Sequence, residues 1–399
     1  MPGRALRRNV SLDSSFEEGI LAVLNVPGPE LGDIAIVLGT RPEIIKLAGI
    51  IRHLGKRART VHTGQHWDDD MAGKFFRDLG IGEPDVRLES VSGQTRGLQV
   101  GNGISELAAH FQKHPVTAVI VQGDTNSTTI GAQAANYLEV PVVHVEAGLR
   151  SHDRAMPEEI NRLVVGAIAD LHCAATPQNA ENLLREGIEP SRVLLTGNTV
   201  VEATLLARDL PHRNVPDMVQ DRVIQEGYVL VTIHRPENTD TPEALERVLA
   251  ALSSVGSNIV FTLHPRTAAA IERFGLQHHL EGFEVLTGVG HADFLELASH
   301  ARLLVSDSGG VQEEVTVLKK PLLVVRRSTE RPESIEAGFS KLITPELDLA
   351  AEISGALADT AWAEALTTRP SPYGDGSASR LIAERAQSLL GREVALPVS

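Results

Sequence analysis

Short apolar runs alternate along the chain with longer stretches in which apolar residues recur every three or four positions. The runs IAIVL (34–38), VTAVIV (116–121) and PVVHV (141–145) are nearly uninterrupted, which is typical of strands buried on both faces of a parallel sheet. The stretch 42–54 has helical spacing, and Pro42 suits a first helical turn. This alternation predicts an α/β fold with parallel sheets.

The alternation occurs twice, on either side of a polar, proline-containing stretch within residues 200–216. Two Rossmann-like halves joined by a hinge imply a cleft between them. We therefore expect a flexible or accessory extension over residues 1–30, a first domain over 31–200 and a second domain over 201–376. A C-terminal helix within residues 377–399 is expected to pack back on the first domain.

Composition excludes several classes of function. A chain of 399 residues exceeds what one core usually holds, which agrees with two domains. The net charge of −15 argues against a nucleic-acid surface or an anionic membrane surface, and no apolar run approaches the roughly 18 residues of a membrane span. The single cysteine, Cys173, excludes an intrachain disulfide and fits a reducing, cytoplasmic location; its apolar neighbours favour a buried thiol over a nucleophile.

Three carboxylates stand where predicted strands end or a predicted helix begins. Asp124 and Glu146 follow the strands at 116–121 and 141–145. Glu158 lies in the first turn of a helix whose inward face is expected at Ile160, Leu163, Val164, Ala167, Ile168 and Leu171. Ligands of parallel α/β sheets bind beyond the carboxyl ends of the strands, so these groups are candidate acids and bases.

Each carboxylate also has a structural interpretation. Asp124 can cap the helix that follows it, and Glu158 can interact favourably with a helix N-terminus. Glu146 can belong to an ion-pair network whose available cations are Arg150, Arg154 and Arg162.

Several cations and a glycine-rich turn are suited to an anionic ligand. Arg41 and Lys46 lie at the start of the first predicted helix, where free N–H groups favour a phosphate; the alternative is a plain turn with two surface cations. SDSGG (306–310) follows a strand and opens a helix that carries Glu313 and Glu314, so it can approach a diphosphate and a ribose, although the same pattern occurs in ordinary turns.

His234 and His264 each follow a predicted strand and have an arginine close by, as in HPRT with Arg266. Hydrogen-bond donors to a phosphate explain them better than a metal site, because they lack helical pair spacing. A buried structural histidine is the alternative for each.

Ten short motifs follow one another over about residues 34–338: GTRPEIIK, TGQH, GDTNST, HVEAGLRS, MPEEINR, TGNTV, VTIHRPEN, LHPR, SDSGGVQEE and TERPES. They occur in the order found in the non-hydrolysing UDP-N-acetylglucosamine 2-epimerases, and the chain resembles that family. The resemblance implies two Rossmann-like domains in the glycosyltransferase B arrangement, with UDP held mainly by the second domain. The resemblance also implies a homodimer. We expect no metal and no nicotinamide cofactor, because the sequence has neither clusters of metal-ligand residues nor a GxGxxG motif.

The family reaction interconverts UDP-N-acetylglucosamine and UDP-N-acetylmannosamine through elimination of UDP to 2-acetamidoglucal and its re-addition. By resemblance, Asp124, Glu146 and Glu158 match the acid/base carboxylates, and His234 matches the histidine assigned to the departing UDP. The residues expected to contact substrate are Arg41, Lys46, Arg150, His264, Arg266, Ser308, Gly309, Gly310, Glu314 and Arg331.

Two departures and three alternatives accompany the resemblance. The first thirty residues lie outside the resemblance. Many bacterial members have a second, regulatory substrate site, in which a glutamine follows shortly after TGQH. Here Trp67 and Asp68 follow TGQH, so activation by substrate is not expected.

Three alternative functions are a hydrolysing 2-epimerase, a glycosyltransferase of the same architecture, and a nucleotide-sugar sensor without turnover.

Overall fold

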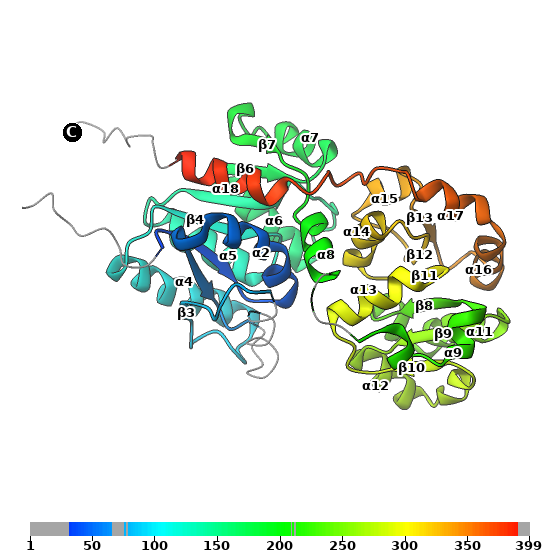
Figure 1. The fold of residues 1–399 in the computed structure, drawn as a ribbon. Helices are drawn as coiled ribbons and strands as arrows, with labels where there is room; N and C mark the ends of the chain where they lie inside the picture. Colours follow the sequence, from blue (N-terminus) through cyan, green and yellow to red (C-terminus); the bar gives the residue numbers. More distant parts are fainter. Residues whose placement is uncertain (1–31, 66–75, 77–78, 209, 211–212, 390–399) are drawn as a thin grey trace, which may run out of the picture.

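The computed structural model describes residues 32–65, 76, 79–208, 210 and 213–389, and it contains two parallel sheets. The N-terminal extension and residues Trp67 and Asp68 lie outside the described residues. All pairings within both sheets are parallel, so the predicted α/β fold class is confirmed. Figure 1 shows the two domains side by side, with helix α8 (Val200–Arg208) between them.

The sheet of the first domain has the order β3-β2-β1-β4-β5-β6-β7. Its strands are β1 Ile34–Leu38, β2 Ala58–His62, β3 Val86–Arg87, β4 Ala118–Gln122, β5 Val142–Ala147, β6 Leu171–Ala174 and β7 Val193–Leu195. The helices of this half, besides α8, are α2 Arg41–Leu54, α4 Arg96–Lys113, α5 Asn126–Asn136, α6 Pro157–Ile168 and α7 Pro177–Arg185.

The sheet of the second domain has the order β10-β9-β8-β11-β12-β13. Its strands are β8 Tyr228–Thr232, β9 Asn258–Thr262, β10 Glu284–Leu286, β11 Leu303–Ser306, β12 Leu322–Val325 and β13 Ser340–Ile343. The helices are α9 Asp221–Glu226, α10 Pro236–Thr239, α11 Pro242–Ser254, α12 Pro265–Phe274, α13 His291–His300, α14 Gly309–Leu318, α15 Pro332–Glu336, α16 Leu349–Ala358 and α17 Thr360–Leu366.

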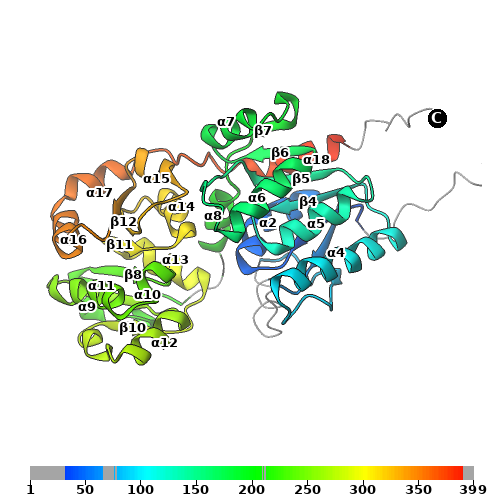
Figure 2. The same ribbon diagram turned by 180° about the vertical axis from the view of Figure 1, so that it is seen from behind.

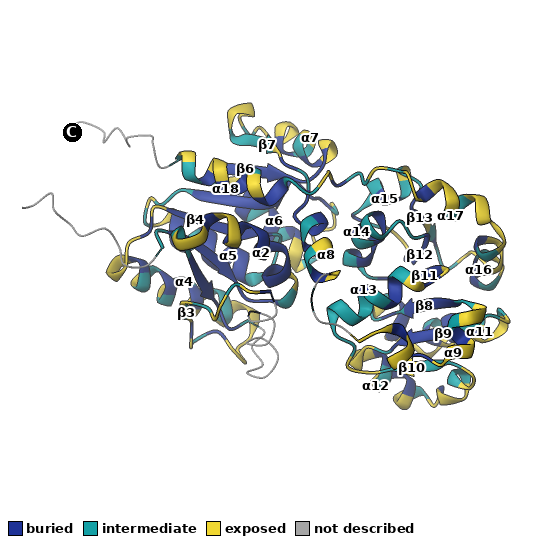
Figure 3. Ribbon diagram, in the orientation of Figure 1, coloured by how far each residue is buried: buried dark blue, intermediate teal, exposed yellow. Residues whose placement is uncertain are grey.

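Alternate residues of β1 pack into the two hydrophobic layers on opposite faces of the first sheet. Ile34, Ile36 and Leu38 pack with α2 on one face of the sheet, whereas Ala35 and Val37 pack on the other face, which α4 and α5 cover. Side chains of successive strand residues point to opposite faces, so a strand with helices on both sides must be apolar throughout. Figures 1 and 2 show these two helical layers from opposite sides, and Figure 3 shows the buried strands between them.

The chain crosses between the domains twice. The first crossing leads into α8; the second returns through Tyr373 to α18 (Ala378–Leu389), which packs on α2 of the first domain through Ile382. The crossings meet where the Asn198 N–H donates to the Tyr373 carbonyl at 2.8 Å. A Cβ at Gly197, where φ is +81°, would lie 2.9 Å from that carbonyl oxygen, so glycine allows the close approach. None of the described helices is long and apolar enough to cross a bilayer.

Two histidines in the first sheet make folding sensitive to pH. His144 on β5 and His172 on β6 are register partners with at most 1% exposure. Burial lowers the pKa of His144 to about 4 and that of His172 to about 3. The unfolded chain, with histidine pKa values of about 6.5, therefore binds more protons below that pH, and stability falls as the pH drops from about 6.5 toward 4.

We expect the urea midpoint of the wild type to fall more between pH 7 and pH 5 than that of His172→Phe, because the variant lacks one buried group that must stay neutral. Unfolding curves of both proteins at the two pH values measure the difference. Equal shifts in wild type and variant would contradict this role of His172.

Candidate active site

The site lies where the carboxyl ends of strands from both sheets approach each other. From the first domain, β4 leads to Asp124 and β5 ends around Glu146; from the second, β8 leads to His234 and β11 leads to Ser308. The carboxyl ends of parallel strands share one edge of a sheet, and this edge is where open α/β sheets bind ligands.

Glu146 adopts a backbone conformation that is rare for a residue other than glycine. Its φ is +61°, and the register with β6 shifts between Val145 and Ala147. Its Oε2 atom accepts hydrogen bonds from Lys46 Nζ at 2.7 Å and Gln122 Nε2 at 2.6 Å, and Arg331 Nη2 lies 3.6 Å from Oε1. Backbone outliers of this kind cluster at functional sites, since the surrounding structure must hold them in place.

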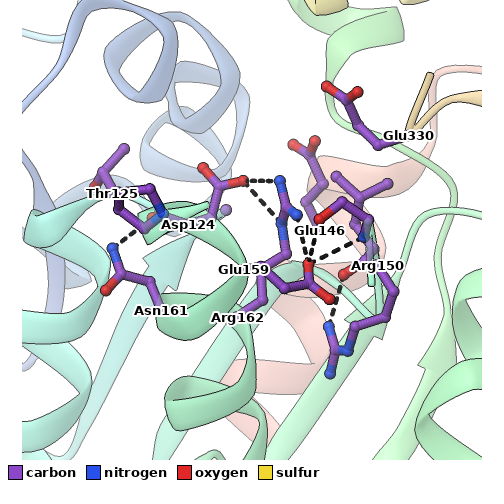
Figure 4. A network of polar contacts seen from close by, with 12 residues as sticks. Asp124, Thr125, Glu146, Arg150, Glu159, Asn161, Arg162 and Glu330 are labelled. Carbon is purple, nitrogen blue, oxygen red and sulfur yellow. Dashed lines mark hydrogen bonds and ion pairs between the residues drawn. The ribbon is translucent and has the colours of Figure 1, made fainter. Parts of the chain in front are cut away.

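Asp124 is held by a buried arginine. Arg162 donates to Asp124 Oδ2 from Nε at 2.9 Å and from Nη2 at 2.6 Å, and its Nη1 donates to Glu159 Oε2 at 2.7 Å. Figure 4 shows the Arg162 guanidinium between the two carboxylates. The side chains of Arg162 and Glu159 are 5% and 2% exposed, whereas that of Asp124 is 26% exposed. Arg162 therefore fixes the orientation of Asp124 but leaves its carboxylate accessible to a ligand.

The helix after Pro157 is present, but its predicted inward face is wrong. The buried residues of α6 are Glu159, Asn161, Arg162, Val165 and Gly166, whereas Ala167 is exposed and Ile160, Leu163, Val164 and Ile168 are half-buried. The polar residues are buried because they bond with each other and with the loops: Glu159 accepts the N–H groups of Ser151 and His152, both at 3.0 Å. Glu158, the adjacent residue, is exposed on the first turn.

The GTRPE turn is tied to the Asp124 loop by Glu43. Glu43 accepts the N–H groups of Gly39 and Thr40 at 3.0 and 2.8 Å, and the Thr125 hydroxyl at 2.7 Å. Burial raises the pKa of Glu43 to about 7, although these hydrogen bonds act in the opposite direction. The turn that presents Arg41 and the loop that presents Asp124 are thereby held together.

Arg41 faces the second domain. Burial lowers the pKa of Arg41, and the negative charge of Glu314 acts in the opposite direction. Glu314 is also hydrogen-bonded to His291, with Nε2 and Oε1 2.7 Å apart. The two expected substrate contacts Arg41 and Glu314 thus interact across the two domains.

The N-terminus of α14 presents backbone N–H groups beside small residues. Ser308 occupies the N-cap without a side-chain capping hydrogen bond. A Cβ added to Gly309 would lie 2.6 Å from Arg331 Nη1, whereas a Cβ at Gly310 would meet no atom within 4 Å. Glycine at 309 thus lets Arg331 approach the helix start, and the surface at Gly310 is open to a ligand. Such helix starts favour phosphate groups.

His234 and His264 lie side by side, with ring centroids 5.1 Å apart. Asp307, which is fully buried, accepts the backbone N–H groups of His234 and Arg235, and its Oδ1 lies 3.2 Å from His234 Nδ1. Burial lowers the pKa of both histidines. With Nδ1 directed at Asp307, the Nε2 atom of His234 is left for a ligand.

Arg150 and Arg266, two expected substrate contacts, form ion pairs within the protein, and Cys173 is buried. Arg150 donates from Nε and Nη2 to Glu186, both at 2.7 Å, and its side chain is 1% exposed. Arg266, beside His264, donates from Nη2 to Asp240 at 2.5 Å. Burial raises the pKa of the Cys173 thiol to about 12, which agrees with an inert structural residue.

The sequence did not single out Glu43, Glu159 and Asp307 as residues of the site. Glu158 and Glu159 are adjacent in the sequence, and they differ in that Glu158 is exposed whereas Glu159 is buried. The sequence alone does not show this difference. A usable signal existed for Asp307, because a carboxylate directly after a buried strand requires partners.

The arrangement combines accessible or cation-paired carboxylates on one domain with a helix start on the other that presents backbone N–H groups. Asp124 and Glu146 are suited to proton transfer, whereas the N–H groups of α14 and His234 are suited to stabilising a departing phosphate.

Comparisons with known proteins agree with this chemistry. The family model described as UDP-N-acetylglucosamine 2-epimerase matches residues 51–386. A UDP-N-acetylglucosamine 2-epimerase of Methanocaldococcus jannaschii is 41% identical over 322 residues, which cover 78% of this chain and 88% of the relative. A UDP-2,3-diacetamido-2,3-dideoxy-D-glucuronate 2-epimerase of Pseudomonas aeruginosa is 35% identical, covering 88% of this chain and 98% of the relative.

Solved structures show the same architecture. One of them is the crystal structure of the Methanocaldococcus jannaschii UDP-GlcNAc 2-epimerase in complex with UDP-GlcNAc and UDP. Its sequence is 35% identical to this chain, and the two structures match with a TM-score of 0.74 over 89% of this chain and 99% of that one. The glycosyltransferase WaaG, involved in lipopolysaccharide biosynthesis, is only 15% identical but has a TM-score of 0.57 over 88% of this chain and 99% of its own, so the predicted glycosyltransferase B arrangement is confirmed. The chain belongs to the UDP-N-acetylglucosamine 2-epimerase family.

Proposed function

We propose that the protein interconverts UDP-N-acetylglucosamine and UDP-N-acetylmannosamine without net hydrolysis. The observation that carries the proposal is that Lys46 bridges the domains between Glu146 and Glu313 of α14, at 2.7 and 2.9 Å. Asp124 follows β4, the strand next to the one that carries Glu146. One ligand can therefore meet proton-transfer groups at its sugar and N–H donors at its diphosphate.

In the proposed reaction a carboxylate removes the proton from C2 while the bond between C1 and the UDP oxygen breaks. The electrons of the C2–H bond form the C1–C2 double bond of 2-acetamidoglucal, and UDP keeps the electrons of the C1–O bond. A second carboxylate then protonates the opposite face of C2, and UDP adds back to C1. Elimination thus needs a base and a stabilised leaving group together.

The proposed roles follow the residue types. Asp124, Glu146 and Glu158 serve as the acid/base carboxylates, and the assignment of each to one face of the sugar is open. His234 donates to the departing diphosphate. The proposed substrate contacts are Arg41, Lys46, Arg150, His264, Arg266, Ser308, Gly309, Gly310, Glu314 and Arg331, of which Arg150 is supported least because its guanidinium is bound to Glu186.

A product assay tests the proposal against the hydrolysing alternative. Purified protein is incubated with UDP-N-acetylglucosamine, and nucleotides and sugars are separated by chromatography. We expect UDP-N-acetylmannosamine to approach an equilibrium with the substrate while free UDP stays at a trace level. Accumulation of UDP in step with N-acetylmannosamine would instead show a hydrolysing enzyme.

The proposal includes a cytoplasmic homodimer. The single cysteine supports a reducing compartment, and the family resemblance supports the dimer. Sedimentation equilibrium of the purified chain tests the dimer directly.

Glu314→Gln is expected to weaken UDP binding about tenfold, because losing a charged hydrogen bond to the ribose costs on the order of 1.4 kcal/mol. At saturating substrate, kcat is expected to stay within a few-fold of wild type. Calorimetric titration with UDP gives the affinity, and Glu336→Gln, a carboxylate change at an exposed position of α15, serves as the control. Unchanged UDP affinity with a large loss of kcat would contradict the assigned role.

A further inference from the structure

Glu313 is a buried carboxylate to which the proposed reaction gives no role. It lies on the second turn of α14, one residue before Glu314, and its side chain is 2% exposed. A buried carboxylate is costly unless cations or hydrogen-bond donors surround it, so its partners indicate its role.

Those partners come from three separate parts of the molecule. Glu313 Oε2 accepts a hydrogen bond from Lys46 Nζ of the first domain at 2.9 Å. Its Oε1 accepts one from Arg331 Nε, directly before α15, at 2.8 Å, and one from Asn198 Nδ2, in the segment that connects the domains, at 3.2 Å. A single carboxylate of the second domain thus contacts the first domain and the connection between them.

The same two cations also contact Glu146. Lys46 Nζ lies 2.7 Å from Glu146 Oε2, and Arg331 Nη2 lies 3.6 Å from Glu146 Oε1. Two carboxylates therefore share two cations, and the four formal charges cancel. Within the described part of the chain, removal of Glu313 would leave the Lys46 ammonium with Glu146 as its one anionic partner and with no partner on α14.

We propose that Glu313 is a positioning residue that holds Lys46 and Arg331 against Glu146 across the two domains. The proposal rests on the proposed function, since Glu146 is assigned there to proton transfer. Glu313 acts through the two cations and need not touch the substrate. Its effect is on turnover, because a displacement of a reacting group by about 1 Å can cost about a hundredfold in rate.

The test compares Glu313→Gln, Glu313→Asp and the exposed control Glu336→Gln with wild type. Glutamine keeps the shape but loses the charge, and its amide N–H groups cannot accept from Lys46. Aspartate keeps the charge but withdraws it by one methylene. We expect kcat to fall about tenfold or more in Glu313→Gln and less in Glu313→Asp, with the UDP dissociation constant unchanged within about twofold.

A second measurement does not depend on turnover. Lys46 is 9% exposed, so reductive methylation followed by mass spectrometry should modify it slowly in wild type and in Glu336→Gln. Faster modification of Lys46 in Glu313→Gln, with unchanged modification of the exposed Lys56, would support the positioning role. Wild-type rates of Lys46 modification in folded Glu313→Gln would overturn it, as would a loss confined to UDP affinity.

The two measurements separate the failure of each proposal. If wild type does not convert UDP-N-acetylglucosamine, the proposed function fails, and the modification rate of Lys46 still decides whether Glu313 positions it. If wild type is active and Glu313→Gln equals it in kcat, the positioning role fails and the proposed function stands. Should Glu313→Gln not fold, Glu313→Asp decides by the same criteria.

Discussion

Glu146→Gln is expected to lower kcat for UDP-N-acetylglucosamine by about a hundredfold or more, because a positioned general acid or base typically contributes at least that much. UDP affinity is expected to stay near that of wild type, since the proposed UDP contacts lie mainly on the second domain. Steady-state kinetics and calorimetric titration with UDP give the two values.

Glu189→Gln is the matched control for this change, because Glu189 is an exposed carboxylate of the same domain. A comparable loss of UDP affinity in Glu146→Gln would mean that the carboxylate chiefly holds Lys46 and Arg331 together across the domains. Its contacts of 2.7 and 3.6 Å to those cations make this the competing interpretation.

Asp124→Asn is expected to reduce kcat by a similar factor of about a hundred. The amide cannot take up or release a proton, and it can no longer form the ion pair with Arg162, whose Nη2 lies 2.6 Å from Asp124 Oδ2. Turnover and UDP binding are measured as for Glu146, with the exposed Asp221→Asn as the control. Turnover close to that of wild type would leave Asp124 with only a structural role as the partner of Arg162 on α6.

The sequence predicted the secondary structure best where the local pattern of apolar residues agrees with their burial in the fold. The runs that precede Asp124 and Glu146 form β4 and β5, and SDSGG forms the start of α14, as predicted. Continuous β-branched runs strongly favour buried strands, and small residues at a helix start are compatible with few other structures. The histidines that follow β8 and β9 came together because those strands are neighbours in the sheet.

The pattern failed where polar residues are buried. On α6 the apolar spacing indicated one inward face, but Glu159 and Arg162 are buried instead, since each satisfies the charge of the other. The Lys46–Glu313 pair joins residues 267 positions apart, and no local pattern encodes such a contact. Which of several charged neighbours becomes buried depends on partners that only the folded chain brings together.

In the proposed reaction the sugar exchanges its C2 proton, and no UDP is released overall. Proton nuclear magnetic resonance of UDP-N-acetylglucosamine with the enzyme in deuterated water follows this exchange. We expect loss of the C2 proton signal through exchange with deuterium, together with new signals of UDP-N-acetylmannosamine. A folded, UDP-binding protein that gives neither exchange at C2 nor the epimer would rule out this reaction.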